Sequence, residues 1–313
     1  MRRCRISGWG TALPDVVVRY GDRTRHRVPD DLGQLDLLAE ASLRAIARAG
    51  LSPDDVDLVV AACAAGVQPI PCTAALVLER VAPGARAAAF DVSSTCTSFV
   101  TALDVVSRLV DGGAYDRALV VSGDVGSRFL DPAAREAAEL FSDAGAAVVV
   151  TRTDVTDDDG PGVLASLQQT WPAHAHDTEL RGGLSLHPAQ AYADGDPADY
   201  LFDMDGRRAL RGMLRVLPGF FDRFFEGAGL TWADLDRVVP HQASGALGLA
   251  MRKVGCPPGL WIDRVDELGN MVSASVPYVL AEELEAGRLG PGDTVLLCGT
   301  AAGLTANALA LRL

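Results

Sequence analysis

Short apolar runs rich in β-branched residues alternate along the chain with longer segments in which apolar residues recur at helical spacing. In the first half, this pattern predicts strands at residues 5–9, 56–62, 87–92, 118–122 and 146–151, and helices at residues 35–49 and 95–110. In the second half, it predicts strands at residues 237–240, 294–298 and 305–311, and helices at residues 205–225, 244–254 and 272–286. Strands that alternate with helices in this way are typical of an α/β fold.

The best candidate for a boundary between two units is the segment 154–162, which contains a run of aspartates followed by glycine and proline. Such a solvated turn predicts a division into residues 1–160 and residues 161–313. Similar sequences begin at Tyr115 and at Pro291, and each leads into a further apolar strand. This similarity indicates a duplicated unit rather than a short repeat.

Composition and charge narrow the classes of protein to which the chain can belong. Of its 313 residues, 49% are hydrophobic and 22% are charged, as in globular proteins. The 41 acidic residues exceed the 28 basic residues and give a net charge of −13, so the field of the molecule repels nucleic acid. Six cysteines without a C-x-x-C pair favour reduced thiols, and no apolar stretch reaches the ~20 residues that span a bilayer. We therefore expect a cytoplasmic protein that binds neither nucleic acid nor membranes.

Cys96 is the first candidate for a chemical role. It lies in Asp91-Val-Ser-Ser-Thr-Cys-Thr-Ser-Phe, where a predicted strand gives way to a predicted helix. Near the exposed N–H groups of a helix N-terminus, a thiol commonly has a lowered pKa and acts as a nucleophile, so the position favours a thiolate. The alternative is that Cys96 is a small buried hydrophobic residue.

Two polar residues in the second half are further candidates. His241 follows the predicted strand 237–240, and α/β proteins often place their sites at strand ends, although a lone histidine can also be structural. Asn270 precedes a predicted helix. It can cap that helix, or its amide can donate a hydrogen bond to an oxygen that develops negative charge.

Other kinds of site receive less support. The glycine-rich segment 299–305 can bring backbone N–H groups close to a substrate carbonyl, but it lacks the Gly-Lys-Ser/Thr of a phosphate-binding loop. A Gly-Trp-Gly sequence near the N-terminus lacks the third glycine of a dinucleotide fingerprint. His174 and His176 have no third ligand at a suitable spacing, so we expect no metal site. They belong to the aperiodic segment 172–199, which we expect to form a surface or active-site loop.

In their order along the chain, Cys96, His241, Asn270 and the glycine-rich segment resemble the thiolase-fold enzymes, specifically β-ketoacyl-acyl-carrier-protein synthase III and its acyltransferase relatives. The resemblance covers almost the whole chain, from Arg5-Ile-Ser-Gly-Trp-Gly onward. It includes Phe141-Ser-Asp-Ala-Gly-Ala, which is similar to the family's Gly-Asp-Gly-Ala-Gly-Ala. It implies a thiolase fold of two similar αβαβαββ halves in a five-layered αβαβα architecture, assembled as a homodimer.

The resemblance also implies a role for each residue. Cys96 would attack an acyl thioester, and the backbone N–H groups of Cys96 and Ala302 would form the oxyanion hole. His241 and Asn270 would face the second substrate. If that substrate is a malonyl thioester, they would stabilise the enolate that forms when CO₂ leaves, and this enolate would attack the acyl group on Cys96. The substrates would be thioesters of coenzyme A or of the phosphopantetheine of an acyl carrier protein, with no bound cofactor.

At several positions the chain departs from the family's pattern. The family's entry motif is shortened to Arg23-Thr-Arg-His-Arg, which leaves coenzyme A recognition by Tyr20 and Arg23 open. An arginine that often helps to dock the carrier protein is replaced in Ser244-Gly-Ala-Leu. Ile70 takes the place where family dimers insert a residue into the partner's acyl pocket, with a core isoleucine as the alternative. Phe141 is assigned to the substrate pocket as well.

Basic residues gather on two predicted helices. The first helix carries Arg207, Arg208, Arg211 and Arg215, and the next ends with Arg252 and Lys253. A local basic patch would suit an acidic carrier protein or a pantetheine phosphate, whereas the alternative is a solvated helix face. The candidate residues for binding coenzyme A or the carrier are Arg23, Arg211, Arg252 and Lys253.

Two other functions stay open beside condensation. The first is an acyltransferase that passes the acyl group from Cys96 to a hydroxyl or an amine, with His241 as general base. The second is a non-catalytic partner that shapes a cavity or binds an acyl carrier. Such a partner would not need to keep Cys96, His241 and Asn270 together, and the retention of Asn270 favours condensation.

Overall fold

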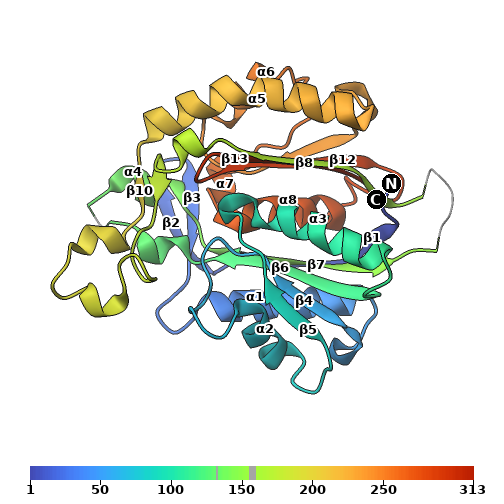
Figure 1. Ribbon diagram of the computed structural model, residues 1–313, viewed down its shortest axis with the longest axis horizontal. Coiled ribbons are helices and arrows are strands. Elements are labelled where there is room, and N and C mark those ends of the chain that lie inside the picture. The colour runs from blue at the N-terminus through green and yellow to red at the C-terminus, as the bar shows by residue number, and fades with distance from the viewer. Residues whose placement is uncertain (132, 155–159) are drawn as a thin grey trace.

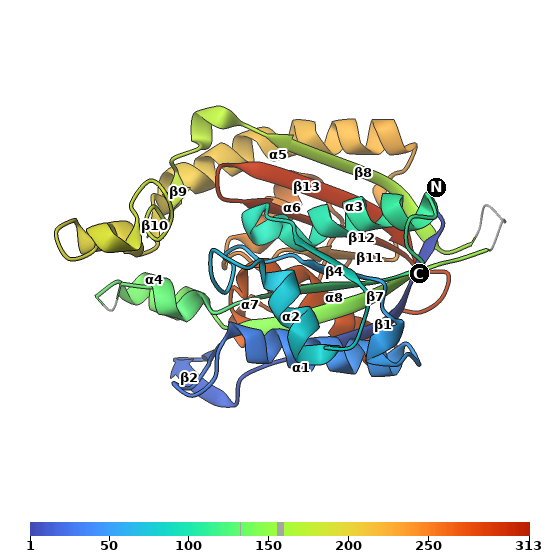
Figure 2. The same cartoon turned by 60° about the horizontal axis from the view of Figure 1, so that its bottom comes forward.

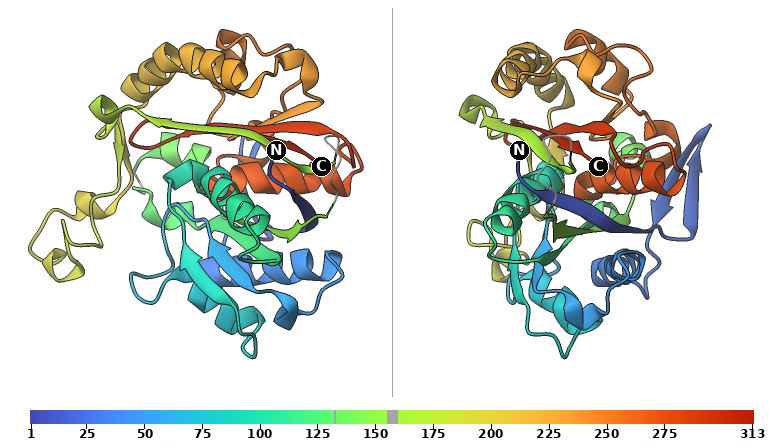
Figure 3. Two further views of the ribbon diagram at one scale, coloured as in Figure 1. Left: turned by 45° about the vertical axis from the view of Figure 1, so that its right-hand side comes forward. Right: turned by 90° about the vertical axis from the view of Figure 1, so that its right-hand side faces the viewer.

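The computed structural model describes residues 1–131, 133–154 and 160–313, and these residues form five stacked layers. Three layers are helical, and their members are α1 (Gln34–Arg48) with α2 (Thr73–Val81), α3 (Ser98–Asp111) with α8 (Ser275–Glu285), and α5 (Gly206–Ala228) with α6 (Leu247–Lys253). In Figure 1, α1 and α2 lie below one sheet, α3 and α8 lie between the two sheets, and α5 and α6 lie above the other. Figure 3 shows the same stack from two further sides. The predicted αβαβα architecture is therefore confirmed.

The first sheet has the strand order β1-β7-β6-β4-β5. Its strands are β1 (Cys4–Ala12), β4 (Leu58–Ala61), β5 (Ala88–Asp91), β6 (Arg117–Asp124) and β7 (Ala144–Arg152). β4 pairs in parallel with β5 and β6, whereas β7 pairs antiparallel with β6 and β1. Because helices cover both faces of the sheet, β4, β6 and β7 are nearly continuous apolar runs rather than alternating ones.

The second sheet has the strand order β11-β12-β13-β8. Its strands are β8 (Gly162–Thr170), β11 (Arg237–Pro240), β12 (Thr294–Ala301) and β13 (Thr305–Arg312). β11 and β12 are parallel, and β12, β13 and β8 are antiparallel. The ends of β11, β12 and β13 carry several of the candidate site residues.

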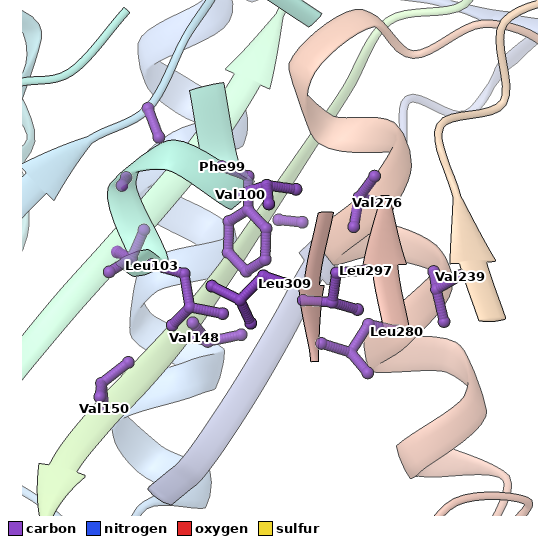
Figure 4. Packing of buried hydrophobic residues seen from close by; sticks show 14 of the residues in the cluster. Phe99, Val100, Leu103, Val148, Val150, Val239, Val276, Leu280, Leu297 and Leu309 are labelled. Atoms are coloured by element: carbon purple, nitrogen blue, oxygen red, sulfur yellow. The ribbon is translucent and has the colours of Figure 1, made fainter. Parts of the chain in front are cut away.

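A single apolar core joins the two sheets through the middle layer. Phe99 and Leu103 of α3 and Leu280 of α8 are buried among residues that include Val148 of the first sheet and Leu309 of the second (Figure 4). A helix between two sheets needs apolar residues on both sides, which explains why α3 and α8 are so apolar. This core therefore fixes the distance between the segment after β5, which contains Cys96, and the segment after β11, which contains His241.

Most of the predicted elements are confirmed, with changes at their ends. The predicted helix 95–110 is divided into a 3₁₀ turn, η2 (Thr95–Thr97), and α3, and the predicted helix 272–286 is divided into η8 (Val272–Ala274) and α8. A residue with positive φ begins each turn, namely Thr95 at 47° and Val272 at 50°. Such backbone cannot continue a right-handed helix, so the chain bends sharply at both places.

The sequence pattern missed several elements besides α2 and β8. They are the hairpin of β2 (Val16–Tyr20) and β3 (Arg23–Arg27), α4 (Arg135–Leu140), α7 (Val265–Leu268), β9 (Thr178–Glu179) and β10 (Asp203–Met204). The β3 strand carries three arginines instead of alternating apolar residues, which hides it from a search for hydrophobic period. β9 and β10 are too short to show a period, and they lie in a lobe that projects from the stack beside α5 (Figure 2).

The predicted boundary at 154–162 includes residues 155–159, which lie outside the described residues. The division into 1–160 and 161–313 therefore stays a prediction. Within the described parts of the chain, no helix has both the length and the apolar composition that crossing a bilayer requires.

Candidate functional site

Cys96 lies in the middle of η2, in a tight turn stabilised by hydrogen bonds to side-chain hydroxyls of neighbouring residues. The Ser94 N–H donates to Ser98 Oγ at 2.8 Å, and that hydroxyl donates to the Thr95 carbonyl at 2.7 Å. Thr97 N–H donates to the Ser94 carbonyl at 3.1 Å. These bonds hold Thr95 in its positive-φ conformation and fix the direction of the residue that follows it.

The surroundings of the Cys96 sulfur keep it protonated. Burial raises the pKa of the thiol most strongly, the Asp124 carboxylate raises it further, and the backbone N–H groups of Ala302 and Cys96 lower it, with a resulting pKa of about 12. The prediction of a lowered pKa is therefore wrong. The reason is that α3 begins only at Ser98, after the 3₁₀ turn, and the two N–H groups do not compensate for the loss of water.

The same two N–H groups come from different parts of the fold. The backbone N–H groups of Cys96 and of Ala302, which lies in the turn between β12 and β13, are close enough to lower the pKa of the sulfur. The first donor belongs to η2 and the second to the opposite sheet. The resemblance to the family named the N–H groups of Cys96 and Ala302, and in the structure both lie near the Cys96 sulfur.

His241 follows β11 and is 4% exposed. Its N–H donates to the Cys298 carbonyl of β12 at 2.8 Å. A Cβ at Gly299 would lie 2.7 Å from His241 Cβ and 3.3 Å from Thr97 Cγ2, so the missing side chain lets His241 and the Cys96 turn lie against the same glycine. Burial lowers the pKa of His241 to about 4, so the imidazole is neutral near pH 7.

Asn270 lies in a loop held from both sides. Its N–H donates to the Leu140 carbonyl at 2.8 Å, and its carbonyl accepts from Ser142 N–H at 2.9 Å, which pairs it with Phe141. Its Oδ1 accepts from Val272 N–H at 2.9 Å, and its Nδ2 donates to the Ala243 carbonyl at 3.1 Å. The carboxamide is thereby attached to the segment that carries His241. An amide nitrogen has two hydrogens, and the bond to Ala243 uses one of them.

Two arginines that sequence reasoning missed support the Asn270 loop. Arg25 is 1% exposed and donates to the carbonyls of Glu139 at 2.6 Å and Asp266 at 3.1 Å. Arg27 donates to the Ala138 carbonyl at 2.8 Å and to the Phe141 carbonyl. The segments before Phe141 and before Asn270 are thus attached to β3. The only signal for this role was the density of arginine in a short segment.

Asp124, at the end of β6, is a further residue that sequence reasoning missed. Its buried carboxylate accepts hydrogen bonds from Ala64 N–H at 3.1 Å, Ala65 N–H at 3.0 Å and Ser273 N–H at 3.1 Å, and from the Ser273 hydroxyl. Burial raises its pKa. It connects the first sheet to η8, and its position after an apolar strand was the signal that could have identified it.

The two predicted pocket residues have opposite surroundings. Phe141 is buried, its ring packs edge-on against Phe202 with centroids 5.0 Å apart, and its backbone pairs with Asn270. Ile70 is 85% exposed in the loop before α2, so the alternative of a core isoleucine is wrong. Phe141 therefore lies beside Asn270, whereas Ile70 is exposed to solvent in a single chain.

The predicted basic residues lie on the surface. Arg23 is about half exposed and pairs with Asp266 at 3.3 Å and Glu139 at 3.9 Å. Arg211 on α5 donates to the Arg207 carbonyl at 3.2 Å, and in the described part of the chain it pairs with no carboxylate. Arg252 and Lys253 end α6 and are exposed.

The histidines of segment 172–199 make local contacts. His174 is paired with Asp177 at 2.7 Å and lies against Gly212 of α5, whereas His176 is exposed beside Glu179 at 3.2 Å. Among residues 1–131, 133–154 and 160–313, no group of His, Cys, Asp and Glu side chains is arranged to hold a metal ion.

Comparison with known proteins shows the family to which the chain is related. A family model for 3-oxoacyl-[acyl-carrier-protein] synthase III matches residues 90–170, and the model for its C-terminal part matches residues 225–313. The chain is 32% identical to the β-ketoacyl-[acyl-carrier-protein] synthase III of Symbiobacterium thermophilum over 100% of its own length and 98% of that protein.

Solved structures agree with this result. The crystal structure of 3-oxoacyl-(acyl carrier protein) synthase III from Pseudomonas aeruginosa has a TM-score of 0.86 at 31% identity, with 99% of this chain and 98% of that chain covered. The priming β-ketosynthase of the R1128 polyketide pathway has a TM-score of 0.88 at 27% identity, with 100% and 96% covered. The chain therefore belongs to the β-ketoacyl-[acyl-carrier-protein] synthase III family of thiolase-fold condensing enzymes, as the order of its motifs predicted.

Proposed function

We propose that the chain transfers an acyl group from a coenzyme A or carrier-protein thioester to Cys96 and condenses it with a malonyl thioester. The observation that carries this proposal is the pair of backbone N–H groups, from Cys96 and Ala302, directed at the Cys96 sulfur. Donors placed here suit the negatively charged oxygen of the tetrahedral intermediate that forms when the Cys96 sulfur attacks a carbonyl carbon. His241 and Asn270 would face the second substrate.

In the first step, the Cys96 sulfur forms a bond to the thioester carbonyl carbon. The carbon–sulfur bond of the donor then breaks, and the thiol proton of Cys96 leaves on the donor thiol. Over the whole step no net charge is created, because both the Cys96 thiol before it and the donor thiol after it are neutral. Ala302 N–H and Cys96 N–H stabilise the oxyanion that exists between the two events.

In the second step, the bond between the malonyl α-carbon and its carboxylate breaks, and CO₂ leaves. The electron pair forms an enolate, whose oxygen accepts hydrogen bonds from a neutral His241 imidazole and from the free N–H of Asn270. The enolate carbon attacks the acyl carbonyl on Cys96. Cys96 then leaves as a thiolate and takes up one proton from solvent, giving a β-ketoacyl thioester.

The test is intact-protein mass spectrometry after incubation with a panel of acyl-coenzyme A donors. We expect a mass increase equal to one acyl group, located on Cys96, and none in the Cys96→Ala variant. Addition of a malonyl thioester should then release CO₂ and yield the β-keto product. Acylation without CO₂ release would contradict condensation, and the absence of acylation with every donor and with acylated carrier protein would contradict the proposal as a whole.

A second function is supported by the protonation state of His241. Because burial lowers its pKa to about 4, the imidazole is unprotonated near pH 7 and can accept a proton from a hydroxyl or amine nucleophile. The product would then be an ester or an amide formed from acyl-Cys96. Acyl-enzyme that is released by added alcohols or amines, but not by a malonyl thioester, would establish this function instead.

We further propose that the exposed basic residues of α5 and α6 bind an acidic carrier protein. Arg211, Arg252 and Lys253 are exposed, and the two helices share the top layer in Figure 1. The Arg211→Glu variant should raise KM for carrier-protein substrates by about tenfold and leave KM for coenzyme A substrates unchanged. Arg223→Glu on the same helix, where Arg223 donates to Gln169, is the matched control. Equal effects of both variants would contradict the assignment.

Ile70 supports a homodimer. Ile70 is 85% exposed in the loop before α2, so its apolar side chain is free to contact a partner chain. We propose that it closes the partner's acyl pocket, and that the dimer acts in the cytoplasm. Light scattering coupled to gel filtration tests the dimer, and a shift of the Ile70→Ala variant toward longer acyl donors tests the role of the side chain.

A further inference from the structure

Asn307 is an unusual residue for its position. It is 3% exposed on β13, and the rest of the strand from Ala306 to Leu311 is aliphatic. A buried carboxamide is destabilising unless its polar atoms are paired. Its partners therefore indicate what the side chain contributes.

Those partners lie in the other half of the chain, beside the nucleophile. Asn307 Nδ2 donates to Thr97 Oγ1 at 2.8 Å and to Thr101 Oγ1 at 3.1 Å. Thr97 is the residue after Cys96, and its hydroxyl donates to the Ser94 carbonyl at 3.1 Å. Thr101 Oγ1 in turn donates to the Thr97 carbonyl at 3.3 Å. One carboxamide thus contacts both the end of η2 and the first turn of α3.

Asn307 is also rigidly connected to Ala302. It lies opposite Gly299 in the antiparallel pair of β12 and β13, and the turn between these strands carries Ala302. Gly299 itself lies against Thr97 and His241. Hydrogen bonds from Asn307 therefore join the hairpin that carries one oxyanion-hole donor to the turn that carries the sulfur and the other donor.

We propose that Asn307 is a positioning residue that sets the distance between Cys96 and the Ala302 N–H. The inference rests on the proposed acylation of Cys96. Without the carboxamide, the hairpin and η2 are free to separate by a fraction of an ångström, and displaced donors stabilise an oxyanion poorly. In alkylation, the thiolate attacks the carbon of an alkyl halide and halide leaves, so no oxyanion forms and the rate depends less on this distance.

The experiment compares two reactions of Cys96 in the full-length protein. Acylation by the best acyl-coenzyme A donor is followed by intact mass, and alkylation by iodoacetamide is followed at the Cys96 peptide. In Asn307→Ala and in Thr97→Val, acylation should slow by about tenfold or more. This loss is smaller than the 10²–10³-fold loss that removal of a whole oxyanion-hole donor causes. Alkylation should slow by about threefold at most. Thr97→Ser keeps the hydroxyl and should retain the wild-type ratio of the two rates.

Loss of stability alone is controlled by Leu309→Val on the same strand. Leu309 is fully buried in the apolar core, so this variant should lower Tm without changing the ratio of acylation to alkylation. Asn307→Ser serves if Asn307→Ala does not fold. A ratio that is unchanged in Asn307→Ala, Asn307→Ser and Thr97→Val would overturn the proposal, as would a ratio that falls equally in Leu309→Val.

Failure of the inference differs from failure of the proposed function. If wild-type protein is acylated but the variants match it, only the inference is wrong. If no donor acylates the wild-type protein, the proposed function is wrong, and hydrogen–deuterium exchange then decides the inference. In that case Asn307→Ala should speed exchange in the peptides that contain Cys96 and Ala302 while the α1 peptides stay unchanged, and equal exchange in all of these peptides would overturn it.

Discussion

The turn that carries Cys96 and the loops that carry His241 and Asn270 are built in different ways. Hydroxyl groups within residues 94–98 hold the Cys96 turn, together with one positive-φ residue. The His241 and Asn270 loops are held by distant elements, among them β3 through Arg25. The Cys96 turn is thus held largely by bonds between neighbouring residues, with one added contact from Asn307, whereas the His241 and Asn270 loops depend mainly on distant elements. Substitutions should therefore act on the two regions differently.

The largest expected effect concerns the Cys96 turn and its pH dependence. Because the pKa of the thiol is raised to about 12, its thiolate fraction should rise about tenfold per pH unit, or about 10³-fold from pH ~7 to pH ~10. The rate of iodoacetamide alkylation at the Cys96 peptide measures this fraction. A plateau below pH ~9 would show a lowered pKa and would contradict the structural result.

The second effect separates the Asn270 loop from the Cys96 turn. Asn270→Asp keeps the acceptor for Val272 N–H but removes the amide donor. Condensation should slow by about 10²–10³-fold, while acylation of Cys96 changes little, because in the proposed mechanism the lost donor faces only the second substrate. Stopped assays that quantify acyl-enzyme and CO₂ in the same sample measure both steps. Equal losses in the two steps would place Asn270 at the acyl site instead.

The third effect is on stability and concerns His241. Its pKa is about 4 in the folded chain and 6.5 in the unfolded one, so the unfolded chain binds the proton more tightly between these values. Stability should therefore fall by about 3 kcal/mol as the pH drops from about 6.5 to about 4. Denaturant unfolding of wild type and His241→Gln at several pH values tests this. The variant should lose that part of the pH dependence, and identical slopes would contradict it.

The smallest effect concerns the link between the two regions. Ser273→Ala removes a hydroxyl that donates to Asp124 and accepts from Ser122 Oγ at 2.9 Å. We expect a loss of about 1–2 kcal/mol in the free energy of unfolding. Ser107→Ala is the matched control, because Ser107 is also buried but its hydroxyl bonds only within α3. If both variants lose the same stability, the Asp124 link is no stronger than an ordinary helix contact.

The sequence was sufficient to predict the layers and the elements that carry Cys96 and His241, but not the supporting residues Arg25, Arg27 and Asp124 or the electrostatics around Cys96. Apolar runs and helical periods predicted the strands that end near Cys96 and His241, because burial fixes those patterns. The pKa of Cys96 could not be predicted in the same way. It depends on burial by the opposite sheet and on Asp124, and neither contact is visible in the local sequence.

The β2–β3 hairpin shows a second limit. The sequence offered Arg23 as a candidate for coenzyme A recognition and gave Arg25 no role, yet Arg25 is buried against backbone carbonyls of two other segments. An arginine gives the same sequence signal whether it faces water or fills a cage of carbonyls. Only the arrangement of β3 against the 138–141 segment distinguishes these cases, and that arrangement is a product of the tertiary structure.

The raised pKa of the Cys96 thiol has a consequence for the lifetime of the protein. Hydrogen peroxide attacks thiolates, and oxidation to sulfinic or sulfonic acid permanently inactivates a nucleophilic cysteine. Because its surroundings raise the pKa of the Cys96 thiol, little thiolate is present near pH 7, and we expect Cys96 to react with peroxide more slowly than a free cysteine does.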